Sequence, residues 1–252
     1  MIKRIGYALI VVLIIGMFAM TVMADQSTGN DAVVTVLQGT ARIYEKGETT
    51  GRLLKKGDTL RNEQEVRVAG KSRLEIRFPD GTVMRLSEKS NLKMNALSFN
   101  KQTNEKKVKT DLSLGKLWAK VKQLTTPDST VEVRTSNAVA GVRGTVYRVN
   151  VEDDKSTMVK VYDGSVYVAN PPRDTSKPIE KVEIPHEVSG PHEVPPPSHE
   201  VSMEEWTTIV RAMQQISISP QGVPSKPETF DPKSDADDWV KWNQERDKET
   251  QF

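Results

Sequence analysis

Cysteine is absent from the 252 residues, and histidine occurs only three times. Without cysteine the chain has no disulfide framework, no thiol nucleophile and no cysteine for a lipid anchor. This composition is compatible with an oxidising compartment, where a stray thiol would be a liability. All three histidines lie between positions 186 and 199, in a proline-rich stretch. The expected folded body therefore has no histidine to serve as the base of a catalytic triad.

Other catalytic patterns are missing too. No glycine-rich phosphate loop opens a helix, and no His-Glu-x-x-His zinc motif occurs. Gly141 and Gly144 are too few for a phosphate loop and lie among predicted strands. The adjacent carboxylates of Asp153 and Asp154 are more typical of a solvated turn than of an acid–base pair. We therefore predict that the protein is not an enzyme and that it holds no cofactor and no metal.

Charge is nearly balanced overall, at a formal +2, but it is unevenly distributed. Residues 25–170 contain 25 Lys and Arg against 18 Asp and Glu, whereas residues 171–252 contain 9 against 16, giving +7 and −7. A basic region can indicate nucleic acid or anionic lipid as a partner. Here the basic residues are spread among predicted strands. We expect no nucleic-acid partner, and we expect the acidic part to lie partly on the basic body.

The first 24 residues have the pattern of a secretory signal peptide. Two basic residues at positions 3 and 4 precede an apolar stretch at 5–20, and small or apolar residues lead to Ala24. We expect cleavage between Ala24 and Asp25, with export to the periplasm or beyond. The alternative is an uncleaved anchor, because the segment is about as long as the roughly 20 residues that span a bilayer. Membrane contact would then be limited to this segment.

Residues 25–170 have the pattern of short strands and tight turns. Apolar and polar residues alternate on both sides of Asp80-Gly81 and of Asp163-Gly164, and each Asp-Gly pair predicts a two-residue hairpin turn. No helical period occurs before residue 200. The pattern predicts an all-β roll or sandwich, followed by a short α-helical C-terminal extension.

A proline-rich linker is predicted at residues 171–201. The tripeptide His-Glu-Val occurs in it three times, beginning at His186, His192 and His199. Histidine and glutamate are ligands for zinc or copper. No scaffold is predicted here to hold such ligands in place, so we interpret the repeats as a duplication in an extended linker.

The extension at residues 202–252 shows two helical signals. The first begins with Ser202 and Glu205, which have the spacing of a capping box. Apolar residues at helical spacing then predict a helix that docks on the β body: Trp206, Ile209, Val210, Met213 and Ile216.

The second helix is predicted from Ser234 to Lys248. Trp239, Trp242 and Arg246 share one of its faces. Two tryptophans at this spacing can form a platform for sugars, or they can pack the terminal helix against the body. We expect packing.

The most distinctive stretch runs from Val131 to Val149. A strand ending at Thr135 leads through small residues to Val142-Arg-Gly-Thr145 and a further strand. This stretch resembles the signature of the FecR domain. Three other segments are similar to that family in the same order, and the resemblance covers roughly residues 50–170: Arg73–Leu86 with Ser90-Asn-Leu92, Leu114–Trp118, and Asp163–Val166.

The resemblance implies a β module that binds something in the cell envelope. Founding members span the membrane and have a cytoplasmic domain that controls a sigma factor in iron uptake. Only four residues precede the apolar stretch here, so we expect only the periplasmic half of such a system. The leading hypothesis is a non-enzymatic interaction or sensing module with an envelope protein as its partner, bound by strand addition or through the tail helices.

Two alternatives stay open. The first is a peptidoglycan or polysaccharide binder that uses exposed aromatic side chains at Trp118, Trp239 or Trp242. The second is an accessory in iron-uptake signalling.

Arg143 lies between Gly141 and Gly144, which allow a bulge or a close backbone approach. Its guanidinium can donate a fork of hydrogen bonds, either as an internal clamp between two layers or as a ligand contact. We expect the clamp, and therefore a marked loss of thermal stability in Arg143→Ala. The candidate binding residues are Arg143, Gly144, Thr145, Trp239 and Trp242.

Overall fold

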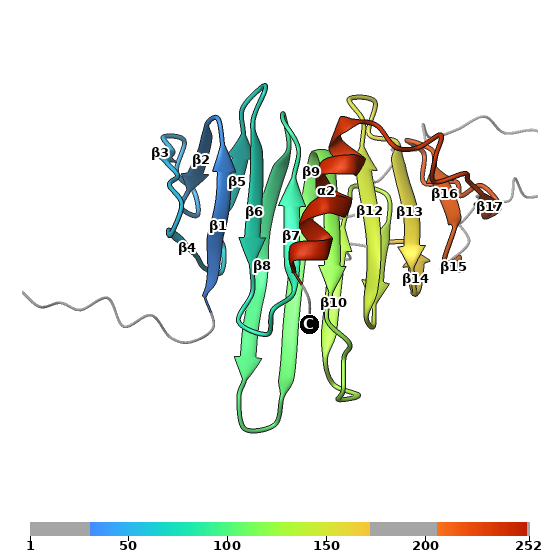
Figure 1. Cartoon of the computed structure of the whole chain (residues 1–252), viewed down its shortest axis with the longest axis horizontal. Coiled ribbons are helices and arrows are strands. Elements are labelled where there is room, and N and C mark those ends of the chain that lie inside the picture. The colour runs from blue at the N-terminus through green and yellow to red at the C-terminus, as the bar shows by residue number, and fades with distance from the viewer. Residues whose placement is uncertain (1–30, 172–205, 251–252) are drawn as a thin grey trace, which may run out of the picture.

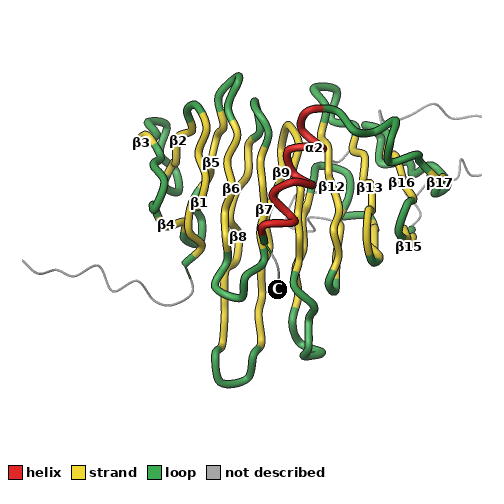
Figure 2. Tube along the Cα trace, viewed as in Figure 1, coloured by secondary structure: helices red, strands yellow, loops and turns green. Residues whose placement is uncertain are grey.

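The computed structural model describes residues 31–171 and 206–250. The predicted signal peptide and the His-Glu-Val linker lie outside the described residues. Strands form nearly all of the regular structure, in two layers joined by one long strand (Figure 2). The predicted all-β fold with a short C-terminal helix is therefore confirmed.

The front sheet faces the viewer in Figure 1, and all of its pairs are antiparallel. Its strands, in spatial order, are β4 (Thr59–Leu60), β1 (Ala32–Gln38), β6 (Arg73–Arg77), β7 (Val83–Leu86), β9 (Glu105–Val121), β12 (Thr145–Val151), β13 (Thr157–Asp163), β16 (Gln214–Ile218) and β17 (Glu228–Thr229).

The back sheet lies behind it, and only its β9–β10 pair is parallel. Its strands, in spatial order, are β3 (Arg52–Leu53), β2 (Ala41–Tyr44), β5 (Glu65–Val68), β8 (Asn91–Asn100), β9, β10 (Thr130–Arg134), β11 (Val139–Val142), β14 (Ser165–Ala169) and β15 (Thr207–Arg211).

Strand β9 belongs to both sheets. Its first part pairs with β8 and β10 in the back sheet, and its second part, from Gly115 onward, pairs with β12 in the front sheet. Gly115 has φ +91°, and a Cβ there would lie 2.6 Å from the backbone of Ser90. Only glycine fits both conditions, so Gly115 lets the strand turn from one layer into the other.

The two Asp-Gly turns behave differently. The predicted hairpin at Asp80-Gly81 is confirmed, since β6 and β7 pair around it, but its loop has three residues, 79–81, because the Phe78 amide donates to the Thr82 carbonyl. The predicted hairpin at Asp163-Gly164 is wrong. Strand β13 pairs with β12 and β16 in the front sheet, while β14 pairs with β11 and β15 in the back sheet. The positive φ of Gly164 serves a corner between the layers, because the same backbone conformation suits either kind of turn.

The core lies between the two sheets. Alternate side chains of each strand point inward and are buried, as the period of a β-strand requires. The inward residues include Leu74, Ile76, Met84, Leu86, Leu117, Tyr147, Val149, Val159, Val161 and Ile216 from the front sheet, and Ile43, Val66, Leu92, Met94, Leu112, Val133, Val166, Val168 and Val210 from the back sheet.

The predicted helix over residues 202–216 is wrong wherever the structure describes it. Residues 207–211 and 214–218 form β15 and β16, which extend the back and front sheets. Ile209 and Met213, which the helical spacing placed on a buried face, are 50% and 44% exposed. Backbone hydrogen bonds to β14 and β13 stabilise these segments as strands. This pairing outweighs the local preference for a helix that the spacing of the apolar residues suggested.

The predicted terminal helix is confirmed as α2 (Asp238–Glu249), which lies across the outer face of the front sheet (Figure 1). Asp237 caps it by accepting a hydrogen bond from the Val240 amide at 2.7 Å. None of the helices in the part of the chain that the structure describes is long and apolar enough to cross a membrane.

Candidate functional site

The Val142-Arg-Gly-Thr145 segment forms the corner between β11 in the back sheet and β12 in the front sheet. Gly144 has φ +99°, and a Cβ there would lie 2.9 Å from the Cα of Gln123. Thr145 is buried and donates its hydroxyl to the carbonyl of Ser165 at 3.0 Å. Gly144 therefore allows the close backbone approach expected from the sequence, and Thr145 fixes the corner through its hydrogen bond.

The internal clamp expected at Arg143 is not found. Its side chain is exposed, and its Nη2 donates a hydrogen bond to the Thr126 carbonyl at 3.2 Å. The corner turns this side chain outward, because Val142 before it and Thr145 two residues after it take the buried positions. Arg143 can bind a ligand from this position, and its role as a binding residue stays a prediction.

We expect Arg143→Ala to lower the free energy of unfolding by about 0.5 kcal/mol or less, since exposed positions away from special features tolerate substitution. Urea denaturation of the two proteins measures this difference. A loss above about 2 kcal/mol would restore the clamp interpretation.

Trp239 and Trp242 stack on each other, with ring centroids 5.3 Å apart and an interplanar angle of 20°. Trp239 is 6% exposed and packs with Trp118 and Val240 between α2 and the front sheet. Trp118 is 1% exposed. This burial favours packing over an open sugar platform, because a stacking sugar needs an accessible ring face.

A charged row runs across the outer face of the front sheet beneath the C-terminal segment. Its members come from neighbouring strands in register, so their side chains project on the same side. From β6 to β13 they are Glu75, Arg85, Trp118, Arg148 and Lys160.

Glu75 and Arg85 form the buried centre of this row, with no exposed side-chain surface on either residue. Arg85 Nε contacts Glu75 Oε2 at 2.7 Å, and its Nη1 contacts Asp247 Oδ1 at 2.6 Å. Arg246 adds a second guanidinium to Glu75, with its Nε 2.7 Å from Oε2. The network therefore joins β6 and β7 to α2 through charge.

Asp235 is a second hub, just before α2. It accepts hydrogen bonds from Arg148 at 2.8 Å, from Lys160 at 2.7 Å and from the Tyr162 hydroxyl. Together with Asp247, it places acidic residues of the C-terminal part on basic residues of the body. This arrangement confirms the expectation drawn from the uneven charge distribution.

These contacts change how the two hub carboxyls titrate. Burial alone would raise the pKa of Glu75, but hydrogen bonds from Arg246, Thr35 and Arg85 outweigh it and lower the pKa to about 2. Burial also opposes ionisation of Asp235, yet hydrogen bonds from Lys160 and Tyr162 keep its pKa below the ordinary value. Both carboxylates are therefore charged at neutral pH and hold the C-terminal segment in place.

The ends of the two sheets differ in a way that matters for binding. Three ends finish in two-residue strands, namely β3, β4 and β17. Such short strands protect a sheet edge from pairing with other chains. The fourth end is β15, which has five residues, and no described strand pairs with its outer side.

The backbone groups of β15 that face outward follow from its pairing with β14. The Asn170 amide donates to the Trp206 carbonyl at 3.4 Å, so residue 206 directs its backbone toward β14. Hydrogen-bonding direction alternates along a strand. Thr207 and Ile209 therefore direct their N–H and C=O groups toward the open edge, whereas the Arg211 amide donates to Gln214 Oε1 at 3.0 Å.

Two large apolar side chains lie beside this edge on the outer face of the back sheet. Tyr167 and Ile209 are cross-strand partners, and each is 50% exposed. The next residue in the row is Gly141, which has no side chain and leaves the flank of Tyr167 uncovered. We call β15 with Tyr167 and Gly141 the open edge.

Sequence reasoning missed the open edge because it interpreted this segment as a helix. The signal that could have found it is the β-branched run from Thr207 to Val210, which favours a strand.

Among residues 31–171 and 206–250, no group of three or more acidic or histidine side chains could hold a metal ion.

Comparison with models of protein families finds a match within the β body. A model described as FecR protein matches residues 64–167. Among characterised proteins, none matched the chain. Two crystal structures of a candidate anti-sigma factor from Parabacteroides distasonis share 17% and 16% sequence identity with it, at TM-scores of 0.46 and 0.44. Each likeness covers 67% of this chain, which spans 61% of the solved chain. On the match to the family model alone, residues 64–167 form a FecR domain.

Proposed function

We propose that this FecR-domain protein is an exported, non-enzymatic interaction module that binds an extended segment of another envelope protein at the open edge. The observation that carries the proposal is the five-residue strand β15, unpaired by described residues on its outer side. Strand addition at such an edge forms main-chain hydrogen bonds, while side-chain contacts provide specificity.

The chemistry of the edge defines the partner segment. Thr207 and Ile209 offer both donors and acceptors, so the segment must be extended with free backbone groups. Tyr167 and Ile209 favour an apolar side chain on the outer face, since burying their exposed halves removes apolar surface from water. The exposed Arg211 at the end of β15 favours an acidic residue in register with it.

Location in the envelope is the second part of the proposal. It is supported by the signal-like first 24 residues and by the absence of cysteine. Cell fractionation tests it. We expect the chain in the periplasmic fraction with Asp25 at its N-terminus, and recovery in the cytosol would contradict export.

Photo-crosslinking in living cells tests the open edge. A photoreactive phenylalanine derivative in place of Tyr167 is expected to capture one recurring envelope protein. The matched control is the same group in place of Leu53, which is 52% exposed on β3 at the opposite end of the same sheet. We expect no capture there, because a two-residue strand offers too few backbone groups.

Two variants distinguish strand addition from nonspecific binding. Thr207→Pro removes an outward amide without breaking the β14 ladder, and Ile209→Lys adds a charge at the edge. Each is expected to reduce capture at Tyr167 about tenfold or more, with a melting temperature near that of the parent chain. Leu53→Lys is the control and should leave capture unchanged.

Three results would contradict the proposal. Equal capture at Tyr167 and Leu53 would indicate nonspecific contact. Capture of a second copy of this chain would assign the edge to self-association. Glycan recovered without protein would favour a wall-binding function.

A further inference from the structure

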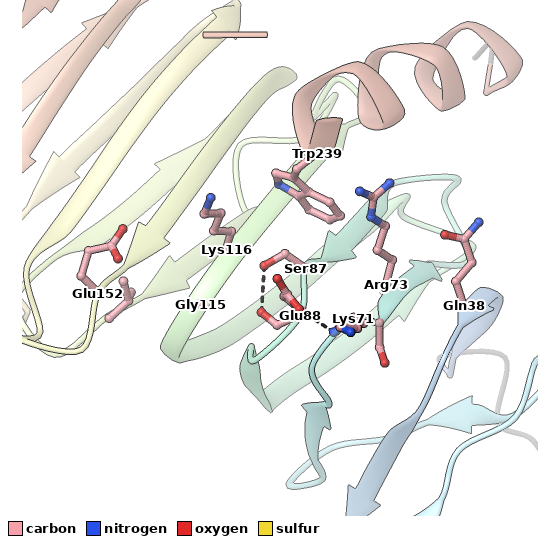
Figure 3. A pocket seen from close by; sticks show the side chains of 11 residues that line it. Gln38, Lys71, Arg73, Ser87, Glu88, Gly115, Lys116, Glu152 and Trp239 are labelled. Atoms are coloured by element: carbon pink, nitrogen blue, oxygen red, sulfur yellow. Dashed lines mark hydrogen bonds between the residues drawn. The ribbon is translucent and has the colours of Figure 1, made fainter. Parts of the chain in front are cut away.

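A cleft of about 450 Å³ opens near the N-terminal end of α2, away from the open edge. Its floor is formed by residues two positions along the same strands from members of the charged row, including Arg73, Ser87 and Lys116. Ser87 donates its amide to the Lys116 carbonyl at 3.1 Å, and Gln38 is the register partner of Arg73. Figure 3 shows Trp239 reaching from α2 over this floor. The volume lies in the range of small-ligand sites.

Arg73 is the most distinctive group in the cleft. Its guanidinium lies 5.4 Å from the centre of the Trp242 ring and 5.9 Å from that of Trp239. It forms no ion pair with any carboxylate of the described residues, whereas the other arginine beneath α2, Arg85, contacts two. Two aromatic rings hold the guanidinium in place and leave its donors available.

Other charged and polar side chains also line the cleft. Lys71 and Lys116 are among them. Lys116 lies toward Glu152 in Figure 3, and its Nζ is 4.0 Å from Asp237 Oδ2. Of the two carboxylates of the cleft, Glu88 accepts a hydrogen bond from the Lys71 amide, and Glu152 lies on the opposite side from Arg73 (Figure 3). The indole Nε1 of Trp239 is buried without a hydrogen-bond partner among the described residues. Arg73 and Trp239 therefore have N–H donors without partners among the described residues, and a ligand with acceptor oxygens suits the guanidinium of Arg73.

We propose that this cleft binds a small carboxylate-bearing ligand, with Arg73 holding the carboxylate and Lys71, two residues earlier in the chain, adding positive charge. Glu152 on the other side attracts an amino group, so a short zwitterionic peptide is the first probe. An acidic sugar would supply the same carboxylate. The proposal concerns a site separate from the open edge and does not depend on a partner protein.

Titration calorimetry with the purified chain tests the site. The probes are tri-alanine, tri-alanine amide and glucuronate. We expect tri-alanine to bind, and we expect its amide, which lacks the carboxylate, to bind at least about tenfold more weakly. Binding of glucuronate in place of tri-alanine would assign the carboxylate to a sugar and would also support the site.

Variants assign the binding to Arg73. Arg73→Gln is expected to weaken binding about tenfold or more, and Lys71→Gln supplies an independent loss if Arg73→Gln disturbs the fold. Arg77→Gln is the matched control on the same strand, outside the cleft. The proposal is overturned if neither carboxylate binds, if amidation changes nothing, or if a folded Arg73→Gln variant binds as well as the parent chain.

Discussion

The Arg85→Met variant should lose about 3–5 kcal/mol of its free energy of unfolding, which is the usual cost of removing one partner of a buried ion pair. Arg85 has no exposed side-chain surface and joins Glu75 to Asp247. Methionine fills much of the same volume, so the loss comes from charge and not from a large cavity. Glu75 would keep Arg246 and Thr35 as partners, but its buried contact with β7 would be gone.

Urea denaturation of parent and variant measures this loss. The control is Arg77→Met, on the exposed end of β6, which should change stability by about 0.5 kcal/mol or less. A double variant, Glu75→Leu with Arg85→Met, should lose less free energy of unfolding than the two single variants together. The effects of substitutions at residues in contact are not additive. An Arg85→Met protein as stable as the parent would show that the network contributes nothing.

Acid is expected to destabilise the fold by about 3 kcal/mol through Glu75 alone. The pKa of Glu75 is about 2 in the folded protein against 4.5 ordinarily. A lowered folded-state pKa contributes stability that is fully present above the ordinary value and is lost as pH falls toward the folded-state value. The loss should therefore develop between about pH 4.5 and pH 2, because a difference of one in pKa between the folded and unfolded chain corresponds to about 1.4 kcal/mol.

The measurement is the free energy of unfolding at several pH values for the parent and for Glu75→Gln. Asp235 also has a lowered pKa and adds acid sensitivity of the same sign to both proteins. The variant isolates Glu75 because glutamine does not titrate. The gap between the two proteins should narrow as pH falls from about 5 to about 2. A constant gap would mean that Glu75 is not the titrating group.

Both predictions concern how α2 is held on the body. The interface combines an apolar part around Trp118, Trp239 and Val240 with the two charged hubs at Glu75 and Asp235. Apolar packing does not fix direction, whereas charge pairs require a particular register. We infer that the hubs position α2, and that position in turn places Trp239 at the cleft.

Local sequence signals determined much of this protein. The alternating runs predicted strands, the Asp80-Gly81 turn predicted its hairpin, and Trp239 with Trp242 predicted a packed terminal helix. Each signal depends on residues within about one turn or one strand of each other, so it can be interpreted without knowing the rest of the chain. The FecR resemblance added the fold family by the same kind of local motif.

Only the tertiary structure decided which strands pair and which side chains are buried. The Asp163-Gly164 turn became a corner because β13 and β14 found partners in different sheets. The segment around Ile209 became a strand because β14 offered an open ladder. Glu75 and Arg85 became buried only when α2, from the far end of the chain, covered them. Pairing and burial depend on distant residues, and a single sequence does not specify those contacts through local patterns.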